Sequence, residues 1–395
     1  STLLASSAAS DVYKRQHILF IAYNLVGGGA EKALVELLRH FDYSRYEVTL
    51  CLLYNEGVYI DEIPAKVKVI VLYDRHDKFH QKSFRKYDKH NNSFWLAMQI
   101  WKKTPRWRYD AIISFLEGYP LLFHSFITLK GKKNITWVHC DLYSFHWTAS
   151  YFNTKVKAEI DCYRKMDKIV FVSRLALVNF DRLYKIDVTK SCIYNVVDSA
   201  HIRSLSVSEE ARHFPKKSLV ITAIGSLKEV KGFDKLIRVG KLLKDDGYSF
   251  LIQIIGTGDD LDDLITLRDD LGLKENIQFL GFMKNPFGYL KHSDIFISTS
   301  LSEGLSLVIC EALILGVPVV ATKTAGAMDL LDNSKYGILV EHDIPSIYQG
   351  VKMLLDDSEL RRQYVERAQE RAKMFDVQKV LDQVYDLLEL SLIHI

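Results

Sequence analysis

Two acidic residues, Glu303 and Glu311, form the pair whose types and spacing could do the most specific chemistry. They lie eight positions apart in the segment 302–312, Ser-Glu-Gly-Leu-Ser-Leu-Val-Ile-Cys-Glu-Ala. A predicted strand precedes this segment, and a helix is predicted to begin at about Ser306. Glu303 would therefore follow a strand, and Glu311 would lie inside the helix, with about 12 Å of helical rise for eight residues.

This span suits a ligand that carries a sugar at one end and a ribose at the other. A carboxylate can accept two hydrogen bonds from a ribose diol. Free N–H groups at the start of the helix can bind a diphosphate between the two acids. From the spacing alone, both residues could equally be helix-capping or surface acids.

A second candidate is Lys231, in the segment 225–233, Gly-Ser-Leu-Lys-Glu-Val-Lys-Gly-Phe. The segment follows a predicted strand directly, and Gly232 opens the next predicted helix. An ammonium group in this place can contact a phosphate. The alternative is a lysine in a solvated loop.

Three consecutive glycines at 27–29 follow the first predicted strand. They allow close approach of a ligand and unusual φ angles, although a tight turn would use them too. They do not form the dinucleotide fingerprint, which needs Gly-x-Gly-x-x-Gly and a later acid. His139 ends another predicted strand, 135–139, and should face the same cleft, although a lone histidine is more often structural.

These residues need a scaffold that brings several strand ends together. Short apolar runs alternate with helical patterns, which is typical of a parallel sheet with crossover helices, and the whole pattern restarts at Ser218. We predict an α/β protein of two doubly wound, Rossmann-like domains, at 17–195 and 196–375, facing each other across a cleft. A last helix, 376–389, should pack back on the N-terminal domain. The predicted strands are 17–23, 47–53, 67–72, 111–114, 135–139 and 168–172, then 219–224, 250–255, 277–280, 295–298 and 317–321.

The composition is that of an ordinary globular enzyme, with 48% hydrophobic and 26% charged residues in a chain of 395. No apolar run reaches the roughly 18 residues of a membrane span. Five cysteines are scattered without a Cys-x-x-Cys pair, so we expect reduced thiols, no zinc site and a cytoplasmic protein. The cysteines are Cys51, Cys140, Cys162, Cys192 and Cys310.

The segment 73–109 is strongly basic, with ten Lys or Arg against three acids, and six Phe or Trp residues are interleaved with them. Basic charge beside aromatic rings suits peripheral contact with an anionic membrane. A solvated face with a few core aromatics is the alternative. Nucleic acid is not an expected partner, because no recognised binding motif accompanies the patch.

Both ends of the chain look foreign to the protein. Residues 11–16, Asp-Val-Tyr-Lys-Arg-Gln, and 390–395, Leu-Ser-Leu-Ile-His-Ile, are encoded by one DNA string and its reverse complement. We interpret segments 1–16 and 390–395 as translated sequencing adaptor or other non-native residues, and exclude them from the prediction of the fold.

Taken together, these motifs resemble glycosyltransferase family 4, the retaining enzymes of the glycosyltransferase-B (GT-B) fold. The resemblance runs from His17 to about Glu389. It rests on the order and spacing of the glycine turn 27–29, His139, the segments 172–174, 195–198, 225–232 and 256–258, the block 303–311, and Ala325-Gly326-Ala327-Met328-Asp329. Similar members build bacterial capsule, lipopolysaccharide or other surface glycans.

The resemblance implies roles for individual residues. Glu311 would hold the ribose hydroxyls of a UDP- or GDP-sugar, Glu303 would contact the donor sugar, and His139 would hydrogen-bond that sugar at the reacting face. Donor-binding groups would also include Gly28, Gly29, Ser226, Lys231, Gly256, Leu305, Ser306 and Leu307.

The reaction implied is transfer of a hexosyl group to a glycan or polyprenyl-linked acceptor, at the inner face of the plasma membrane. The nucleotide sugar is then a co-substrate, and no cofactor is expected. No Asp-x-Asp motif stands at a predicted strand end, so no metal is expected either.

Two positions depart from the family pattern. Ser226 stands where the family commonly has an arginine that binds phosphate, and Asp329 stands where Glu is usual. Two alternatives stay open. One is another enzyme on the same fold, such as a UDP-sugar epimerase, and the other is a catalytically degenerate partner subunit, which Ser226 favours.

Overall fold

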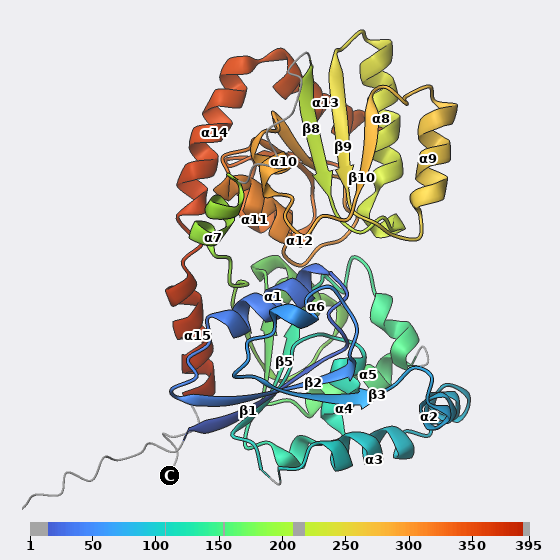
Figure 1. The fold of residues 1–395 in the computed structure, drawn as a ribbon, viewed down its shortest axis with the longest axis vertical. Helices are drawn as coiled ribbons and strands as arrows, with labels where there is room; N and C mark the ends of the chain where they lie inside the picture. The colour runs from blue at the N-terminus through green and yellow to red at the C-terminus, as the bar shows by residue number, and fades with distance from the viewer. Residues whose placement is uncertain (1–14, 107, 153–154, 208–217, 390–395) are drawn as a thin grey trace, which may run out of the picture.

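The computed structural model describes residues 15–106, 108–152, 155–207 and 218–389. They form two lobes, each a parallel sheet covered by helices, stacked one above the other (Figure 1). Of the segments interpreted as non-native, only Arg15 and Gln16 lie inside the described residues, and Gln16 begins the first strand.

The N-terminal lobe is a seven-stranded sheet in the order β3-β2-β1-β4-β5-β6-β7. All neighbouring strands in it are parallel. Its strands are β1 (Gln16–Ala22), β2 (Tyr46–Tyr54), β3 (Lys68–Tyr73), β4 (Ala111–Ser114), β5 (Asn134–Val138), β6 (Lys168–Phe171) and β7 (Thr189–Cys192). Its helices are α1 (Gly29–Arg39), α2 (Lys78–His90), α3 (Phe94–Lys103), α4 (Tyr119–Ser125), α5 (Val156–Arg164) and α6 (Arg174–Leu183).

The C-terminal lobe has six parallel strands in the order β10-β9-β8-β11-β12-β13. Its strands are β8 (Leu219–Ile224), β9 (Phe250–Ile255), β10 (Ile277–Gly281), β11 (Ile295–Ser298), β12 (Val319–Thr322) and β13 (Ile338–Val340). Its helices are α7 (Ser199–Leu205), α8 (Phe233–Asp245), α9 (Leu261–Asp270), α10 (Phe287–Lys291), α11 (Leu307–Ile314), α12 (Ala325–Leu331), α13 (Ile344–Asp356) and α14 (Ser358–Ala372).

The strand order reverses once in each lobe, between β1 and β4 and between β8 and β11. In open parallel sheets, ligands bind beyond the carboxyl ends of the strands at such a switch point. The glycine turn 27–29 follows β1, the loop 225–232 follows β8, and Glu303 follows β11. The topology therefore brings the predicted site residues to the carboxyl ends of the strands of both sheets, which face each other across the space between the lobes.

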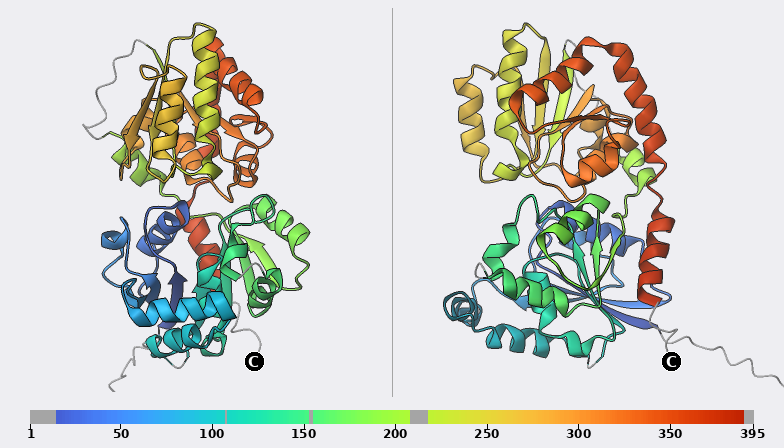
Figure 2. Two further views of the ribbon diagram at one scale, coloured as in Figure 1. Left: turned by 90° about the vertical axis from the view of Figure 1, so that its right-hand side faces the viewer. Right: turned by 180° about the vertical axis from the view of Figure 1, so that it is seen from behind.

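The last helix, α15 (Val377–Glu389), leaves the C-terminal lobe and packs on the N-terminal one (Figure 2). The Tyr385 ring stacks on Tyr46 at 5.3 Å between centroids, and its hydroxyl oxygen accepts a 2.8 Å hydrogen bond from the Asp42 N–H. Lys133 donates a 2.7 Å hydrogen bond to the Leu387 carbonyl. The chain thus crosses between the lobes twice, at the linker before α7 and again at α15.

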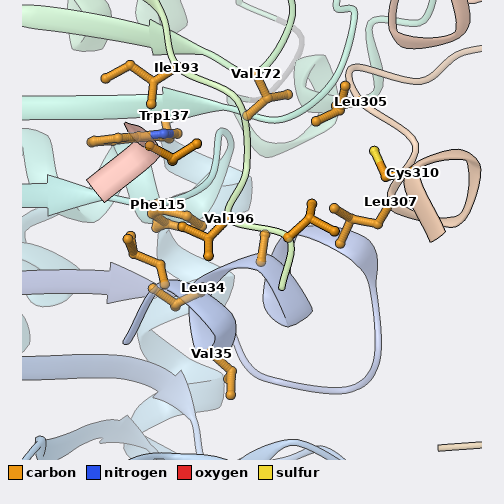
Figure 3. Close-up of a cluster of buried hydrophobic side chains, with 14 of the residues drawn as sticks. Leu34, Val35, Phe115, Trp137, Val172, Ile193, Val196, Leu305, Leu307 and Cys310 are labelled. Carbon is orange, nitrogen blue, oxygen red and sulfur yellow. The ribbon is translucent and has the colours of Figure 1, made fainter. Parts of the chain in front are cut away.

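One hydrophobic cluster is shared by the two lobes. Figure 3 shows Leu34 and Trp137 from the N-terminal lobe in the same cluster as Leu305 and Leu307 from the C-terminal lobe, with Val196 of the linker between them. Burial of this shared apolar surface favours the observed contact between the lobes.

The fold prediction is confirmed, including the helix that crosses back. Two strands, β7 and β13, were not predicted, and β5 ends at Val138, so His139 is the first residue after the strand. Trp107 of the basic segment lies outside the described residues. In the part of the chain that is described, no helix has the length and apolar character to cross a membrane.

Candidate active site

A cavity of about 410 Å³ lies between the lobes, and both lobes line it. Ten of the predicted site residues are in its lining, and His139 is not. The ten are Gly28, Gly29, Ser226, Lys231, Gly256, Glu303, Leu305, Ser306, Leu307 and Glu311.

Glu303 and Lys231 form an ion pair on the C-terminal side of the cavity. Lys231 lies in a short 3₁₀ helix, Glu229–Lys231, and its carbonyl accepts a 2.9 Å hydrogen bond from the Thr299 hydroxyl. The Ser300 hydroxyl donates to Glu303 Oε1 at 2.9 Å. The loops after β8 and β11 thus hold the predicted phosphate-binding lysine against the predicted sugar-binding acid.

Glu311 also has a lysine partner, and it comes from the opposite lobe. Lys32 of α1 donates to Glu311 Oε1 at 2.6 Å. The Glu311 side chain is only 4% exposed. A buried carboxylate needs such a partner, because burial of an unpaired charge is strongly unfavourable. The sequence interpretation gave Lys32 no role.

Two helix N-termini face the cavity, one from each lobe. Gly28 precedes α1 and Ser306 precedes α11, and neither N-cap residue makes a side-chain capping hydrogen bond, although the Glu31 carboxylate lies at the first turn of α1. Both N-cap residues line the cavity. Uncapped N–H groups and the positive end of the helix dipole make such termini good sites for anions, diphosphates among them.

Close contacts between backbones explain several glycines around the cavity. A Cβ on Gly256, whose φ is +148°, would lie 1.8 Å from the Gly225 carbonyl oxygen. A Cβ on Gly304 would lie 2.2 Å from the His139 carbonyl oxygen. The second contact joins the lobes, since Gly304 is beside Glu303 and His139 follows β5. Larger side chains at either position would push these loops apart.

His139 lies behind the cavity wall, at this contact between the lobes. Its ring packs on Phe115 at 4.7 Å between centroids, and its Nε2 atom is buried without a hydrogen-bond partner among the described residues. Burial lowers the pKa of His139 to about 3, so the imidazole is neutral. A neutral ring with a free nitrogen can hydrogen-bond a ligand but cannot supply a proton near pH 7.

Three further charged residues lie beside the predicted ones. Glu117 follows β4, is buried, and accepts a 2.9 Å hydrogen bond from the His139 N–H. Burial raises the pKa of both Glu117 and Glu31. Lys228 and Glu31 line the cavity near Ser226 and the glycine turn respectively. Their places in the sequence could have identified them: Glu117 and Lys228 lie in the loops that follow β4 and β8, and Glu31 lies beside the predicted glycine turn 27–29.

Asp329 has a structural place in the contact between the lobes. Its carboxylate accepts a 2.6 Å hydrogen bond from the Arg174 N–H at the start of α6. A C-terminal-lobe acid therefore contacts the first turn of an N-terminal-lobe helix, where negative charge is favourable.

A group of potential metal ligands lies outside this cavity. Within the described ranges, the one such group is Glu36, His40 and Asp198, at the junction of α1 and the linker. His40 Nε2 is 3.1 Å from Glu36 and 3.3 Å from Asp198, so the three side chains already satisfy one another. The five cysteines are free thiols.

Comparison with known proteins identifies both halves of the chain. Residues 27–201 match the model of Glycosyltransferase Family 4, and residues 207–371 match that of Glycosyl transferases group 1. The N-terminal half of the chain is therefore a Glycosyltransferase Family 4 domain and the C-terminal half a group 1 glycosyl transferase domain, and the class of the protein is that of a glycosyl-transferring enzyme.

Individual relatives agree with this assignment. The chain is 29% identical over 371 residues to N-acetylgalactosamine-N,N'-diacetylbacillosaminyl-diphospho-undecaprenol 4-alpha-N-acetylgalactosaminyltransferase of Campylobacter jejuni, covering 92% of this chain and 97% of that one. It is 29% identical to the capsular polysaccharide biosynthesis glycosyltransferase CapM of Staphylococcus aureus, over 36% of this chain and 38% of the relative. The crystal structure of HepE from Anabaena in complex with UDP and glucose superposes with a TM-score of 0.76 at 19% identity, covering 95% of this chain and 100% of that one.

Proposed function

We propose that this chain is a retaining hexosyltransferase of bacterial surface-polysaccharide synthesis. It would move the sugar of a UDP- or GDP-sugar to a hydroxyl of a glycan or lipid-linked acceptor. The observation that carries the proposal is the meeting of two acid–lysine pairs and two uncapped helix N-termini around one cavity.

The donor diphosphate lies between the two helix N-termini in this proposal. Amides at the start of α11 and at Gly28 and Gly29 donate to its oxygens, and the Lys231 ammonium adds a charged contact. Glu311 receives the ribose hydroxyls, and Glu303 contacts the sugar. Gly256, which lies against the Gly225 carbonyl oxygen, lets the loops after β8 and β9 pack closely beside the nucleotide.

In the chemical step the bond between the anomeric carbon and the diphosphate oxygen breaks, and a bond to the acceptor oxygen forms on the same face. The acceptor proton passes to the departing diphosphate. Preorganised amides and Lys231 stabilise the growing negative charge, which is the usual largest contribution to catalysis. No metal or cofactor is required in this proposal. His139 does not line the cavity, so its hydrogen bond to the sugar stays a prediction from the family resemblance, and its neutral ring would not donate a proton.

The acceptor proposed is lipid-linked and lies at the cytoplasmic face of the membrane. The name of the Campylobacter relative includes an undecaprenol-linked substrate. In this chain the basic segment 73–109 forms α2 and α3 on the N-terminal lobe, and Phe94 at the start of α3 is 62% exposed. Exposed aromatic and basic side chains together favour contact with an anionic lipid surface.

The experiment is a screen of nucleotide sugars against a bacterial lipid extract, read by mass spectrometry. We expect a nucleoside diphosphate and a glycosylated lipid from one donor. An isomerised nucleotide sugar without an acceptor would instead identify an epimerase. A protein that binds neither UDP nor GDP in calorimetry would be a degenerate subunit, the alternative that Ser226 favours.

Variants of the cavity residues test the site itself. Glu311→Ala should weaken donor binding and Lys231→Ala should lower turnover, each by about ten- to a hundredfold, because a charged hydrogen bond contributes about 1.5–3 kcal/mol. Steady-state kinetics with the donor found in the screen measure both. Unchanged kinetics in both variants would contradict the proposed site.

A further inference from the structure

The ion pair between Lys32 and Glu311 crosses the cleft inside the proposed donor site. Lys32 comes from α1 of the N-terminal lobe, and its ammonium makes its side-chain hydrogen bond and its aromatic contact with residues of the C-terminal lobe. Its ammonium bonds Glu311 at 2.6 Å and lies 4.9 Å from the centroid of the Phe287 ring. The N-terminal lobe therefore places a cation against an acid of the site that belongs to the other lobe.

Glu311 depends on this lysine for its charge partner. Among the described residues, Lys32 is the one cation in contact with the Glu311 carboxylate. Burial lowers the pKa of Lys32, but the charge of Glu311 and its hydrogen bond more than offset this, so the pKa is raised and the ammonium stays charged. Without Lys32, an anionic carboxylate would lie 4% exposed beside an anionic ligand, which is strongly unfavourable.

The pair leaves part of Glu311 available to a ligand. Lys32 bonds Oε1, whereas the described residues offer no hydrogen bond to Oε2. Both residues line the donor cavity and also a neighbouring cavity of about 370 Å³, so the pair lies at the border between the two. One carboxylate oxygen is thus fixed, and the other can accept from a hydroxyl.

We propose that Lys32 is a positioning residue for ribose recognition: it fixes the orientation and charge of Glu311 from the opposite lobe. The inference rests on the proposed function, in which Glu311 receives the ribose. Since the lysine and the acid meet only when the lobes touch, the N-terminal lobe completes a part of the nucleotide site that is otherwise built by the C-terminal lobe.

The test is calorimetric binding of UDP and GDP and of their 2′-deoxy and 3′-deoxy analogues. Wild-type protein should prefer the ribonucleotide by about tenfold, since a hydrogen bond to a charged group is lost in an analogue. Lys32→Met keeps the length of the side chain without its charge. It should bind the ribonucleotide about tenfold more weakly and the deoxy analogues almost as the wild type does, so the preference largely disappears.

Glu62→Gln is the matched control. Glu62 also comes from the N-terminal lobe and forms a 2.9 Å ion pair across the cleft with Lys284, but that pair is more exposed and does not touch Glu311. This variant should keep the wild-type preference for ribose.

Three outcomes would overturn the inference. In the first, Lys32→Met weakens ribo- and deoxynucleotides equally, and the pair only joins the lobes. In the second, Lys32→Met binds UDP or GDP as tightly as the wild type does and prefers the ribonucleotide over the deoxy analogues to the same degree. The proposed function would survive both of these results. In the third, the wild type binds neither UDP nor GDP, and the proposed function fails together with the inference.

Discussion

At the residue scale, the charge of the cavity is closely balanced. Four lysines line it, at positions 32, 228, 231 and 284, against three acids, Glu31, Glu303 and Glu311. Three of the lysines are already paired with acids, Lys32 and Lys231 with acids of the cavity and Lys284 with Glu62. Attraction for a diphosphate would therefore depend on Lys228 and on the amides at the helix N-termini, and the arginine that the family resemblance leads us to expect at position 226 would add to it.

Restoring that arginine should strengthen nucleotide binding. Ser226 is exposed and lines the cavity, so a longer side chain fits without displacing buried groups. Ser226→Arg should raise the affinity for UDP or GDP by about tenfold, because a guanidinium can make two charged hydrogen bonds to a phosphate. Calorimetry measures the change. Ser226→Gln adds length without charge, and an equal gain in that variant would refute the electrostatic explanation.

The sequence allowed a common location to be predicted for residues whose neighbours along the chain carry a pattern, whereas the roles of these residues stay predictions. Glu303, Glu311 and Lys231 stand beside strands and glycines that indicate a ligand-binding edge, and the structure brings all three to one cavity. Lys32 carries no such local pattern. Its importance arises from Glu311, which is 279 positions away along the chain.

At the element scale, α1 links the cavity to the connection between the lobes. Its N-terminus faces the cavity, Lys32 reaches the C-terminal lobe, and its last turn holds Glu36, which hydrogen-bonds the C-cap residue His40. His40 also contacts Asp198, which ends the linker between the lobes and is the N-cap residue of α7. Helix α1 thus contacts the C-terminal lobe at the cavity, through Lys32, and the linker between the lobes, through His40.

The His40 contacts should make stability depend on pH. The hydrogen bond to Glu36 and the charges of Glu36 and Asp198 raise the pKa of His40 above 6.5, against burial and the nearby Arg39. The stabilisation is therefore complete below about pH 6.5 and is lost as pH rises through the folded-state pKa. His40→Gln should cost about 1 kcal/mol or less at pH 5.5 and almost nothing at pH 9.

Denaturant unfolding of both proteins at the two pH values measures this difference. His201→Gln changes an exposed histidine on α7 and should show no such dependence. A His40→Gln effect that is equal at both pH values would mean that the side chain acts by packing and not by charge.

The two strands that sequence analysis missed are either polar or very short: β7 lacks an apolar pattern, and β13 is apolar but has only three residues. β7 is Thr-Lys-Ser-Cys, and it is a strand because β6 offers it a hydrogen-bonded edge. β13 has three residues and pairs only with β12 at the other sheet's edge. Central strands such as β1 and β9 are buried on both faces and therefore read as continuous apolar runs. The edge strands β3 and β10 were predicted, whereas a polar or three-residue edge strand depends on its neighbour in the sheet, which a single sequence does not show.

At the scale of the whole molecule, the lobes are joined by contacts of different strength. The shared apolar cluster and α15 bury large side chains, whereas the Lys284–Glu62 pair is more exposed and contributes little. Helices α2 and α3 lie at the end of the N-terminal lobe that is remote from the C-terminal lobe (Figure 1). This end is thus free to contact a surface while the cleft remains accessible to nucleotide.

The proposed membrane contact is therefore a property of one end of the molecule. Vesicles of phosphatidylglycerol and phosphatidylcholine should retain the protein at low salt, whereas phosphatidylcholine alone should not, because each basic side chain near an anionic surface contributes about 1 kcal/mol. Phe94→Asp removes an exposed ring from the start of α3 and adds a negative charge, and should weaken binding at least fivefold.

Met353→Asp makes the same change at a residue of 50% exposure on α13 of the C-terminal lobe, and it should bind as the wild type does. Sedimentation with the vesicles measures all three proteins. An equal loss of vesicle binding in Phe94→Asp and Met353→Asp would show that added negative charge weakens binding wherever it is placed. Failure of the wild-type protein to sediment with anionic vesicles would remove the membrane from the proposed function, while leaving the nucleotide site unaffected.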